Sequence, residues 1–303
     1  MKSRNYAGIS LLASLAACNS ATAETVQKNS TQDPKKPNVI VILADDLGYG
    51  DLKCYGAKNV ETPHVDKLAS EGIRFTNAHT VAATSTPSRY SLLTGEYAWR
   101  RPDTDIAAGD VKMIIRPEQY TMADMFKSAG YATAAIGKWH LGWDWTHKEG
   151  KAKTVDNIGF TKRVANGPTD RGFDYFYGLT SPSGPPYLYM VNDMAEKQPN
   201  TRFEESGGGL YKIKGGIGHS DWSADGMQPH LADKMLEYLD ENKDSDKPFF
   251  LYMALTAPHI PLFPSKEFKG KSKIGDYGDL VMMIDDIVGR VNRKLKEIGK
   301  YDN

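Results

Sequence analysis

This sequence contains few cysteines and no excess of charge of either sign. Only two of its 303 residues are cysteines, and 38 lysine and arginine side chains balance 38 aspartates and glutamates. So few cysteines do not indicate a disulfide framework. A formal net charge of zero favours neither a nucleic acid nor an anionic membrane as a partner, so we expect any anion to be recognised by locally placed cations.

Long apolar runs are also scarce, and the one near the N-terminus, residues 9–17, is too short to span a bilayer. Lys2 and Arg4 precede this run and small residues follow it, which is the pattern of an export signal. We therefore predict a signal peptide over residues 1–23 and a polar tether over residues 24–36, and we exclude both from the fold.

Two cleavage sites compete within this leader. Residues 15–18, Leu-Ala-Ala-Cys, resemble a bacterial lipobox that would leave Cys18 as a lipid-bearing N-terminus, whereas residues 21–23, Ala-Thr-Ala, fit an ordinary signal-peptidase site. We favour the lipobox because it explains the position of one of the two cysteines. The expected location is the periplasm or cell envelope of a bacterium, with membrane contact only through the lipid. Cys54 then has no disulfide partner.

Strands and helices are predicted to alternate along the rest of the chain. Residues 39–43, Val-Ile-Val-Ile-Leu, have the pattern of a strand buried on both faces of a parallel sheet. Thr62 is expected to cap one helix, and Thr121 with Asp124 to form a capping box on another. Further strands are predicted at residues 132–136 and 249–256, and helices at residues 63–72, 87–93, 121–127 and 276–298. The alternation predicts an α/β fold with a largely parallel sheet.

Two adjacent carboxylates, Asp45 and Asp46, follow the first predicted strand directly. The C-terminal edge of a parallel sheet is where such folds bind ligands. Adjacent carboxylates repel each other unless a cation lies near them, and their hard oxygens suit Ca²⁺ or Mg²⁺. The alternative is that one of the two aspartates caps the following turn, and the pair alone does not decide between these interpretations.

The segment 84–95, TSTPSRYSLLTG, predicts a site for an oxyanion. Pro87 suits the first position of a helix with Thr86 as its cap, so Ser85 is expected just outside a helix N-terminus. Unpaired backbone N–H groups and the positive end of the helix dipole would face a group bound at Ser85, and Arg89, one turn on, can fold back toward it. The alternative is a helix cap beside a surface arginine.

A lysine and two histidines are also predicted at strand ends. Lys138 and His140 follow the strand predicted at 132–136, in the run Gly-Lys-Trp-His-Leu-Gly, and His259 follows the strand at 249–256. A single histidine is more often structural. Here three such groups, together with the aspartate pair, are predicted to meet at one edge of the sheet, which indicates a functional site.

The motif at residues 85–95, Ser-x-Pro-Ser-Arg-x-x-Leu-Leu-Thr-Gly, resembles the signature of the sulfatase family. The aspartate pair, residues 137–142, the segment Pro-His-Ile-Pro at 258–261 and residues 59–77 are similar to the same family, and the resemblance extends over residues 37–298. It implies an alkaline phosphatase-like sandwich with a mixed, largely parallel sheet flanked by helices. Residues 37–303 would be its N-terminal catalytic domain.

The resemblance also implies roles for these residues. In the family the first residue of the motif is oxidised to Cα-formylglycine, which implies that Ser85 is modified by a formylglycine-generating maturation enzyme. Residue 85 would then be the nucleophile and, with Asp45 and Asp46, a ligand of Ca²⁺, or alternatively of Mg²⁺. Arg89 would stabilise the aldehyde hydrate, and Lys138 would contact the sulfate. His140 would accept a proton. His259 would contact the sulfate and protonate the leaving alcohol.

The expected function is that of a sulfuric ester hydrolase acting on sulfated carbohydrates or aryl sulfates. The alternatives are a phosphodiesterase or phosphonate hydrolase of the same superfamily, and an inactive glycan-binding fragment. Residues 145–225, rich in glycine, proline and aromatics, are expected to form long loops over a cleft. Aromatics at 175–177 and 185–189 would either stack on sugar rings or pack internally.

One departure from the family concerns the end of the chain. Family members continue beyond the helix at 276–298 into a strand that ends in an Asp-Asn pair, which completes the metal site, and then to a second lysine. This sequence ends at Asn303 without them. We therefore expect an incomplete domain with weak Ca²⁺ binding and little or no activity.

Overall fold

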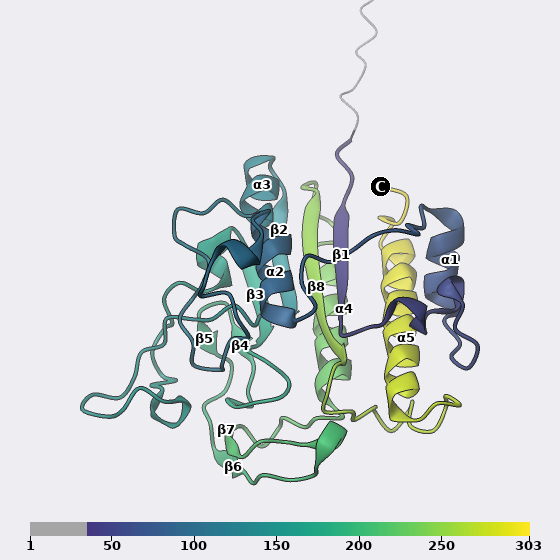
Figure 1. Ribbon diagram of the computed structural model, residues 1–303. Helices are drawn as coiled ribbons and strands as arrows, with labels where there is room; N and C mark the ends of the chain where they lie inside the picture. Colours follow the sequence, from purple (N-terminus) through teal and green to yellow (C-terminus); the bar gives the residue numbers. More distant parts are fainter. Residues whose placement is uncertain (1–34) are drawn as a thin grey trace, which may run out of the picture. The chain divides into compact units, whose positions relative to one another are not determined.

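A six-stranded sheet organises the computed structural model of this chain, which describes residues 35–303 (Figure 1). Its strands lie in the order β1 (Val39–Asp45), β8 (Phe249–Pro258), β2 (Ala132–Lys138), β3 (Tyr175–Leu179), β4 (Met190–Val191) and β5 (Met194–Ala195). The first four strands pair in parallel, and β4 and β5 are added antiparallel. This arrangement confirms the predicted mixed, largely parallel α/β sheet.

The predicted leader, Cys18 and residues 24–34 of the tether lie outside the described residues. Within residues 35–303, no helix is both long enough and apolar enough to cross a bilayer.

Helices cover both faces of the sheet. On one face, α4 (Met227–Glu241) and α5 (Asp276–Glu297) pack against β8, and α1 (Pro63–Glu71) packs against α5. On the other face, α3 (Met122–Ser128) contacts β2 and α2 (Ser85–Thr94). Short 3₁₀ helices lie at Tyr49–Asp51, Lys53–Tyr55, Ala98–Arg100, Val155–Asn157, Pro168–Arg171 and Gly209–Tyr211.

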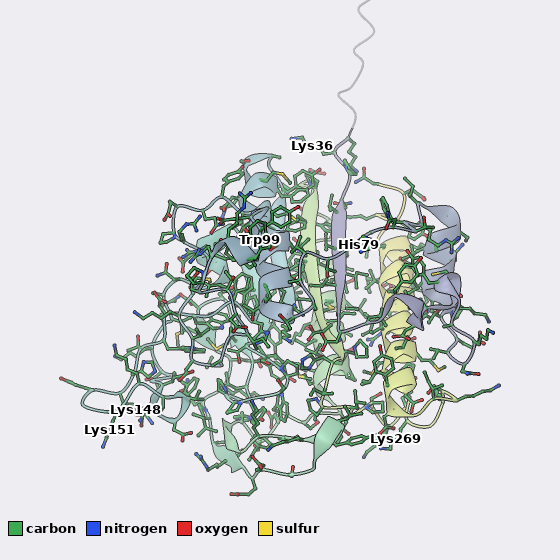
Figure 2. All side chains as sticks on the ribbon, in the orientation of Figure 1. Lys36, His79, Trp99, Lys148, Lys151 and Lys269 are labelled. Carbon is green, nitrogen blue, oxygen red and sulfur yellow. The ribbon has the colours of Figure 1, made fainter. Side chains whose placement is uncertain are left out.

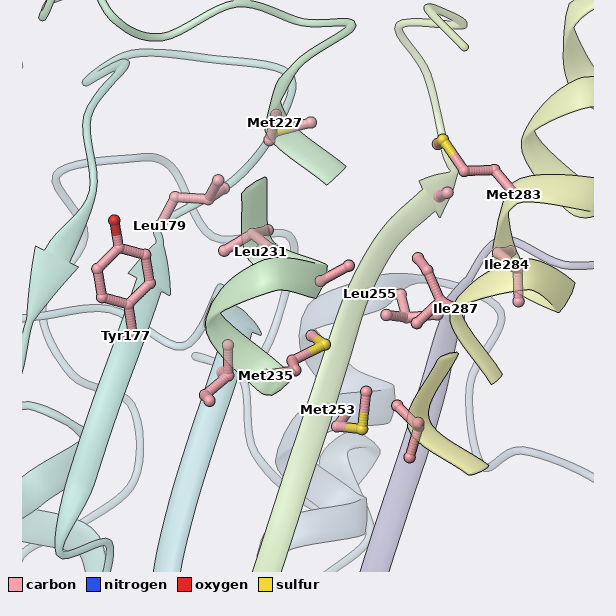
Figure 3. Close-up of a cluster of buried hydrophobic side chains, with 14 of the residues drawn as sticks. Tyr177, Leu179, Met227, Leu231, Met235, Met253, Leu255, Met283, Ile284 and Ile287 are labelled. Atoms are coloured by element: carbon pink, nitrogen blue, oxygen red, sulfur yellow. The ribbon is translucent and has the colours of Figure 1, made fainter. Parts of the chain in front are cut away.

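Burial of strand β8 on both faces explains why its sequence is apolar throughout. Alternate side chains of a strand point to opposite faces. Phe249, Leu251, Met253 and Leu255 pack among residues of α4 and α5, and Figure 3 shows Met253 and Leu255 beside them. The intervening Phe250, Tyr252 and Ala254 belong to a second cluster with α2 and α3. Both faces are therefore buried, as in strands of a parallel sheet that is covered on two sides.

The expectation that the first strand is buried on both faces is wrong for most of its length. Residues 39–44 of β1 are only half-buried, and Asp45 is the strand's one buried residue. The reason is position: among the described residues β1 lies at the edge of the sheet and pairs only with β8. A continuous β-branched run thus predicted the strand correctly and its burial incorrectly.

The helix predictions at residues 63–72, 121–127 and 276–298 are confirmed as α1, α3 and α5. In α3 both bonds of the predicted capping box are present, because Thr121 Oγ1 accepts from Asp124 N and Asp124 accepts from Thr121 N. Thr62 stands at the N-cap of α1 but makes no side-chain capping bond. Helix α4 was not predicted.

Residues 145–225 are not only loops, contrary to the expectation. They hold β3, β4, β5 and a two-stranded antiparallel sheet of β6 (Thr201–Phe203) and β7 (Gly216–Gly218). Their aromatics mostly pack internally: Phe176, Tyr177 and Tyr187 are no more than 2% exposed. The sugar-stacking interpretation is therefore wrong for these three rings.

Candidate active site

Three strand ends meet at one edge of the sheet and position the predicted site. Asp45 ends β1 and lies in register with Pro258 at the end of β8, while Lys138 ends the neighbouring β2. Gly137 makes the approach of β2 to β8 possible: its φ is +123°, and a Cβ there would lie 1.9 Å from the carbonyl oxygen of Ala254. The edge predicted from parallel topology is thus where these side chains gather.

Asp45 is the centre of a buried charge cluster. Its Oδ1 accepts from Arg89 Nη2 at 2.9 Å and from Ser85 Oγ at 3.3 Å, and its Oδ2 accepts from Lys138 Nζ at 2.7 Å. Burial would raise the pKa of Asp45, but the two cations beside it outweigh burial and hold the pKa well below its ordinary value. Asp45 is therefore a carboxylate throughout the neutral range.

Ser85 is the first residue of α2, so the helix begins two residues before the predicted start at Pro87. Pro87 is tolerated within the first turn because backbone N–H groups there have no intrahelical acceptor. Arg89, one turn later, donates from Nε to Ser85 Oγ at 2.7 Å, as the sequence led us to expect. The hydroxyl thus lies at a helix N-terminus between a guanidinium and a carboxylate.

Thr86 is not the cap of α2, contrary to the prediction. The N-cap is Thr84, whose side chain makes no capping bond. Thr86 is instead buried, and its hydroxyl donates to the carbonyl oxygen of His140 and accepts from Ala107 N, each at 3.0 Å. It therefore joins α2 to the segment that carries His140.

Arg89 is 1% exposed and is fixed by more than the two groups above. Its Nη1 donates to the carbonyl oxygen of Lys138 at 3.0 Å and to the hydroxyl of Tyr252 at 3.4 Å. Tyr252, in the middle of β8, was missed from the sequence because an aromatic residue within an apolar strand is typical of a core. Its buried hydroxyl gives the guanidinium a further partner.

Lys138 lies wholly inside the protein. Burial lowers its pKa to about 8, against the opposing pull of Asp45. The ammonium form therefore predominates at neutral pH, and its charge is directed at Asp45.

His140 is buried and stays neutral. Burial, with the positive charges of Lys138 and Arg89, lowers its pKa to about 3. Its Nε2 lies 2.9 Å from the carbonyl oxygen of Ala107, and because a carbonyl only accepts, Nε2 carries the proton. Nδ1 is then an unprotonated acceptor, and it has no partner among the described residues.

Asp46 and His259 lie at the more exposed part of the site. The Asp46 side chain is half exposed, and His259 Nε2 is 3.5 Å from its Oδ2.

Two residues of the site have an unusual backbone conformation. Asp46 has φ +63° and His140 has φ +57°, in the left-handed region that non-glycine residues rarely adopt. Such backbone strain is common at functional sites.

A cavity of about 150 Å³ joins the predicted metal ligands. Asp45, Asp46 and Ser85 line it together with Arg89, whereas Lys138, His140 and His259 are not part of its wall. Carboxylate and hydroxyl oxygens are the type of ligand that Ca²⁺ prefers. Those in this cavity do not fill its shell of about six to eight ligands, and the described residues contain no cluster of three or more His, Cys, Asp or Glu that could hold a metal.

Comparison with known proteins now decides the family. The model of the family described as Sulfatase matches residues 37–303. The chain belongs to the sulfatase family. The N-acetylgalactosamine-6-O-sulfatase of Bacteroides thetaiotaomicron is 36% identical, over 96% of this chain and 61% of its own length. The human N-acetylgalactosamine-6-sulfatase is 31% identical, over 89% of this chain and 48% of its own length.

Solved structures of sulfatases share the fold. One from work on glycosaminoglycan metabolism by Bacteroides thetaiotaomicron has a TM-score of 0.76 and 34% identity, covering 89% of this chain and 61% of the solved chain. A sulfatase from Pseudoalteromonas sp. has a TM-score of 0.66 and 27% identity, covering 88% and 53%. The phosphonate monoester hydrolase of Agrobacterium radiobacter, at 17% identity and TM-score 0.52, shows the fold alone; it covers 88% of this chain and 60% of its own.

The chain spans only 61% of the length of the Bacteroides relative and about half of the human one. Family and fold are thus established for the matched residues.

Proposed function

We propose that this protein is a sulfuric ester hydrolase that removes sulfate from sulfated carbohydrates. The observation that carries the proposal is the Ser85 hydroxyl, held at the N-terminus of α2 between the carboxylate of Asp45 and the guanidinium of Arg89. Two similar proteins are N-acetylgalactosamine-6-sulfatases by name, which makes 6-O-sulfated N-acetylgalactosamine the first substrate to test. Aryl sulfates are the alternative substrate class.

Ser85 is the residue that a maturation enzyme would oxidise to Cα-formylglycine. The side chain would lose one hydrogen from Cβ and one from Oγ, and an electron acceptor of the maturation enzyme would take up the two electrons. The hydrate of this aldehyde supplies two hydroxyls on one carbon, one to attack sulfur and one to expel sulfate, which a serine hydroxyl cannot do.

The other groups of the site would bind the anion and transfer protons. The N-terminus of α2 and the buried cations Arg89 and Lys138 favour a negatively charged group. His140, neutral and with Nδ1 free, is suited to accept a proton from the hydroxyl at residue 85. His259, next to Asp46 at the more exposed side, is suited to protonate the leaving alcohol.

Ca²⁺ is the metal that we propose for this site, with Mg²⁺ as the alternative. Asp45, Asp46 and the oxygen of residue 85 would hold it, since these donors line one cavity. The bound ion would supply positive charge to the sulfate oxygens. With so few donors, we expect weak binding by the described residues, measurable by calorimetry with CaCl₂.

The decisive test is the mass of the peptide that contains residue 85. After co-expression with a maturation enzyme of the anaerobic bacterial type, we expect a loss of two hydrogens relative to serine, and no such change in Ser85→Ala. We expect sulfate release from N-acetylgalactosamine 6-sulfate to be slow, in keeping with weak Ca²⁺ binding, but still faster than that of the Ser85→Ala variant. Unmodified serine in the co-expressed protein would contradict the proposal.

We also propose that the protein is exported as a lipoprotein, on the strength of the lipobox-like residues 15–18. Mass analysis of the mature N-terminus would show a lipidated Cys18, and a free N-terminus at Glu24 would contradict it.

A further inference from the structure

A second cavity, larger than the one at Ser85, lies mostly among residues that follow His140 in the chain. It measures about 530 Å³ and is lined by residues from two segments, 110–112 and 143–153. Its wall is rich in positive charge and in indole rings. The side chains in question are Lys112, Lys148, Lys151, Lys153, Trp143 and Trp145. Two of the lysines, Lys148 and Lys151, lie on the loop that projects at the lower left of Figure 2.

The lysines of this cavity are not neutralised by ion pairs. None of the four forms a salt bridge among the described residues, and Lys148 Nζ reaches only the carbonyl oxygen of Asp156, at 3.4 Å. Three carboxylates also line the cavity. In one of them, Asp144, both oxygens already accept hydrogen bonds, from Asn166 Nδ2 at 2.7 Å and from Met113 N at 3.3 Å. With four lysines against three carboxylates, the wall keeps a formal net charge of +1, which favours an anion.

Two buried ring nitrogens without hydrogen-bond partners also indicate a bound ligand at this cavity. Trp143 is 1% exposed, and its indole N–H has no hydrogen-bond partner among the described residues; the same holds for His147 Nε2. The neighbouring indoles differ, since Trp145 Nε1 donates to Gly109 O and Trp139 Nε1 to Gly142 O. A buried polar group without a partner is unusual in a folded protein and calls for a ligand or a water molecule.

The cavity is continuous in the chain with the segments that carry His140 and its contact Ala107. The contact of His140 Nε2 with Ala107 O joins these segments on the side of the active site, and Trp143 N donates to Val111 O at 2.9 Å beside the cavity. His140 and Trp143 are three positions apart in the chain, so their Cα atoms lie at most about 11 Å from each other. The Trp143 end of the cavity therefore lies close to His140, a separation within the length of a short oligosaccharide.

We propose that this cavity is an anion-binding subsite for a sulfated glycan chain whose reacting sulfate lies at Ser85. The lysines and the unpaired indole N–H would bind a sulfate or carboxylate on a neighbouring sugar, and the indole rings give the sugar an apolar wall. The identity of the chain rests on the proposed function. The positive, partly aromatic cavity rests on the structure alone.

Calorimetry with a chondroitin 6-sulfate hexasaccharide tests this subsite. We expect the double variant Lys148→Ala/Lys151→Ala to bind the hexasaccharide about fivefold to tenfold more weakly, while N-acetylgalactosamine 6-sulfate binds both proteins equally. Trp143→Phe, which removes the N–H but keeps most of the ring volume, should also weaken hexasaccharide binding, with its folding checked by thermal unfolding. Unsulfated chondroitin shows whether the lysines recognise sulfate or carboxylate.

Lys269→Ala is the matched control, because this lysine lies on the other side of the molecule in Figure 2. The inference is wrong if the double variant binds the hexasaccharide as tightly as the parent, if Lys269→Ala weakens it equally, or if the parent does not bind it. Failure of the proposed function has a different signature: residue 85 remains serine and the 6-sulfated monosaccharide is not hydrolysed, whatever the hexasaccharide does.

Discussion

Arg89 and Ser85 lie one turn apart on α2, and Arg89 Nε donates to Ser85 Oγ at 2.7 Å. The other nitrogens of the same guanidinium donate to Asp45, to the carbonyl oxygen of Lys138 and to Tyr252. Because these contacts come from three separate elements, the guanidinium cannot turn away from the hydroxyl without losing several of them. Arg89 therefore fixes the position of residue 85 and also stabilises the fold.

Arg89→Lys should show that the hydrogen bonds of the planar guanidinium, and not only its charge, stabilise the fold. Lysine keeps the positive charge but cannot donate to Ser85, Asp45 and the Lys138 carbonyl together, so we expect a loss of about 2–3 kcal/mol in the free energy of unfolding, measured in urea. Arg290→Lys, in a more exposed pair with Asp233, should cost less than about 1 kcal/mol. Equal losses would contradict the special role of Arg89.

Asp45→Asn and Asp46→Asn test two neighbouring carboxylates that differ in burial. The first leaves Lys138 and Arg89 as buried cations without a counter-charge and should lower the free energy of unfolding by about 3–5 kcal/mol. The second changes a half-exposed side chain and should cost about 0.5 kcal/mol or less. Both variants should weaken Ca²⁺ binding in calorimetry. A substitution of Asp46 that leaves Ca²⁺ affinity unchanged would remove it from the metal site.

Buried His140 should make the protein less stable in acid. Its pKa is lowered to about 3 in the fold from about 6.5 in the unfolded chain, so the unfolded state binds more protons between these values. The stabilisation is present above pH 6.5 and is lost as the pH falls toward 3, by up to about 1.4 kcal/mol per pH unit. His140→Gln should flatten this slope between pH 6.5 and 5, and His79→Gln, at an exposed site, should not. Identical slopes in all three proteins would contradict the lowered pKa.

Asp285 of α5 supplies the cap that Thr62 does not give to α1. Its Oδ1 accepts from the backbone N–H groups of His64 and Val65, at 2.9 and 2.8 Å. Asp285→Ala leaves both donors unsatisfied and should lower the free energy of unfolding by about 2–3 kcal/mol. Asp285→Asn keeps an acceptor in place and should cost about 1 kcal/mol or less, measured by the same urea titration. A loss as large in Asp285→Asn would show that the charge, and not the acceptor, holds α1.

The elements that could be predicted from the sequence carry local signals. Strand β8 is uniformly apolar, α3 has its capping box, and α5 has a long apolar stripe that ends before Gly299. Helix α4 lacks such a start: its N-cap is Gly226, with no capping side chain, and Pro229 lies in its first turn. Strand β3 is short, and its pairing with β2 cannot be read from its own residues.

For the candidate site, the sequence alone predicted which side chains carry charge and which edge of the sheet they share, because strand ends and helix starts are local features. Tertiary structure decided what surrounds them. Burial and the neighbouring charges together set the pKa values of Asp45 and Lys138, and burial holds His140 neutral with one nitrogen free. Tyr252 joined the site only because folding brings the middle of β8 against α2, a contact between residues 163 positions apart that no local pattern indicates.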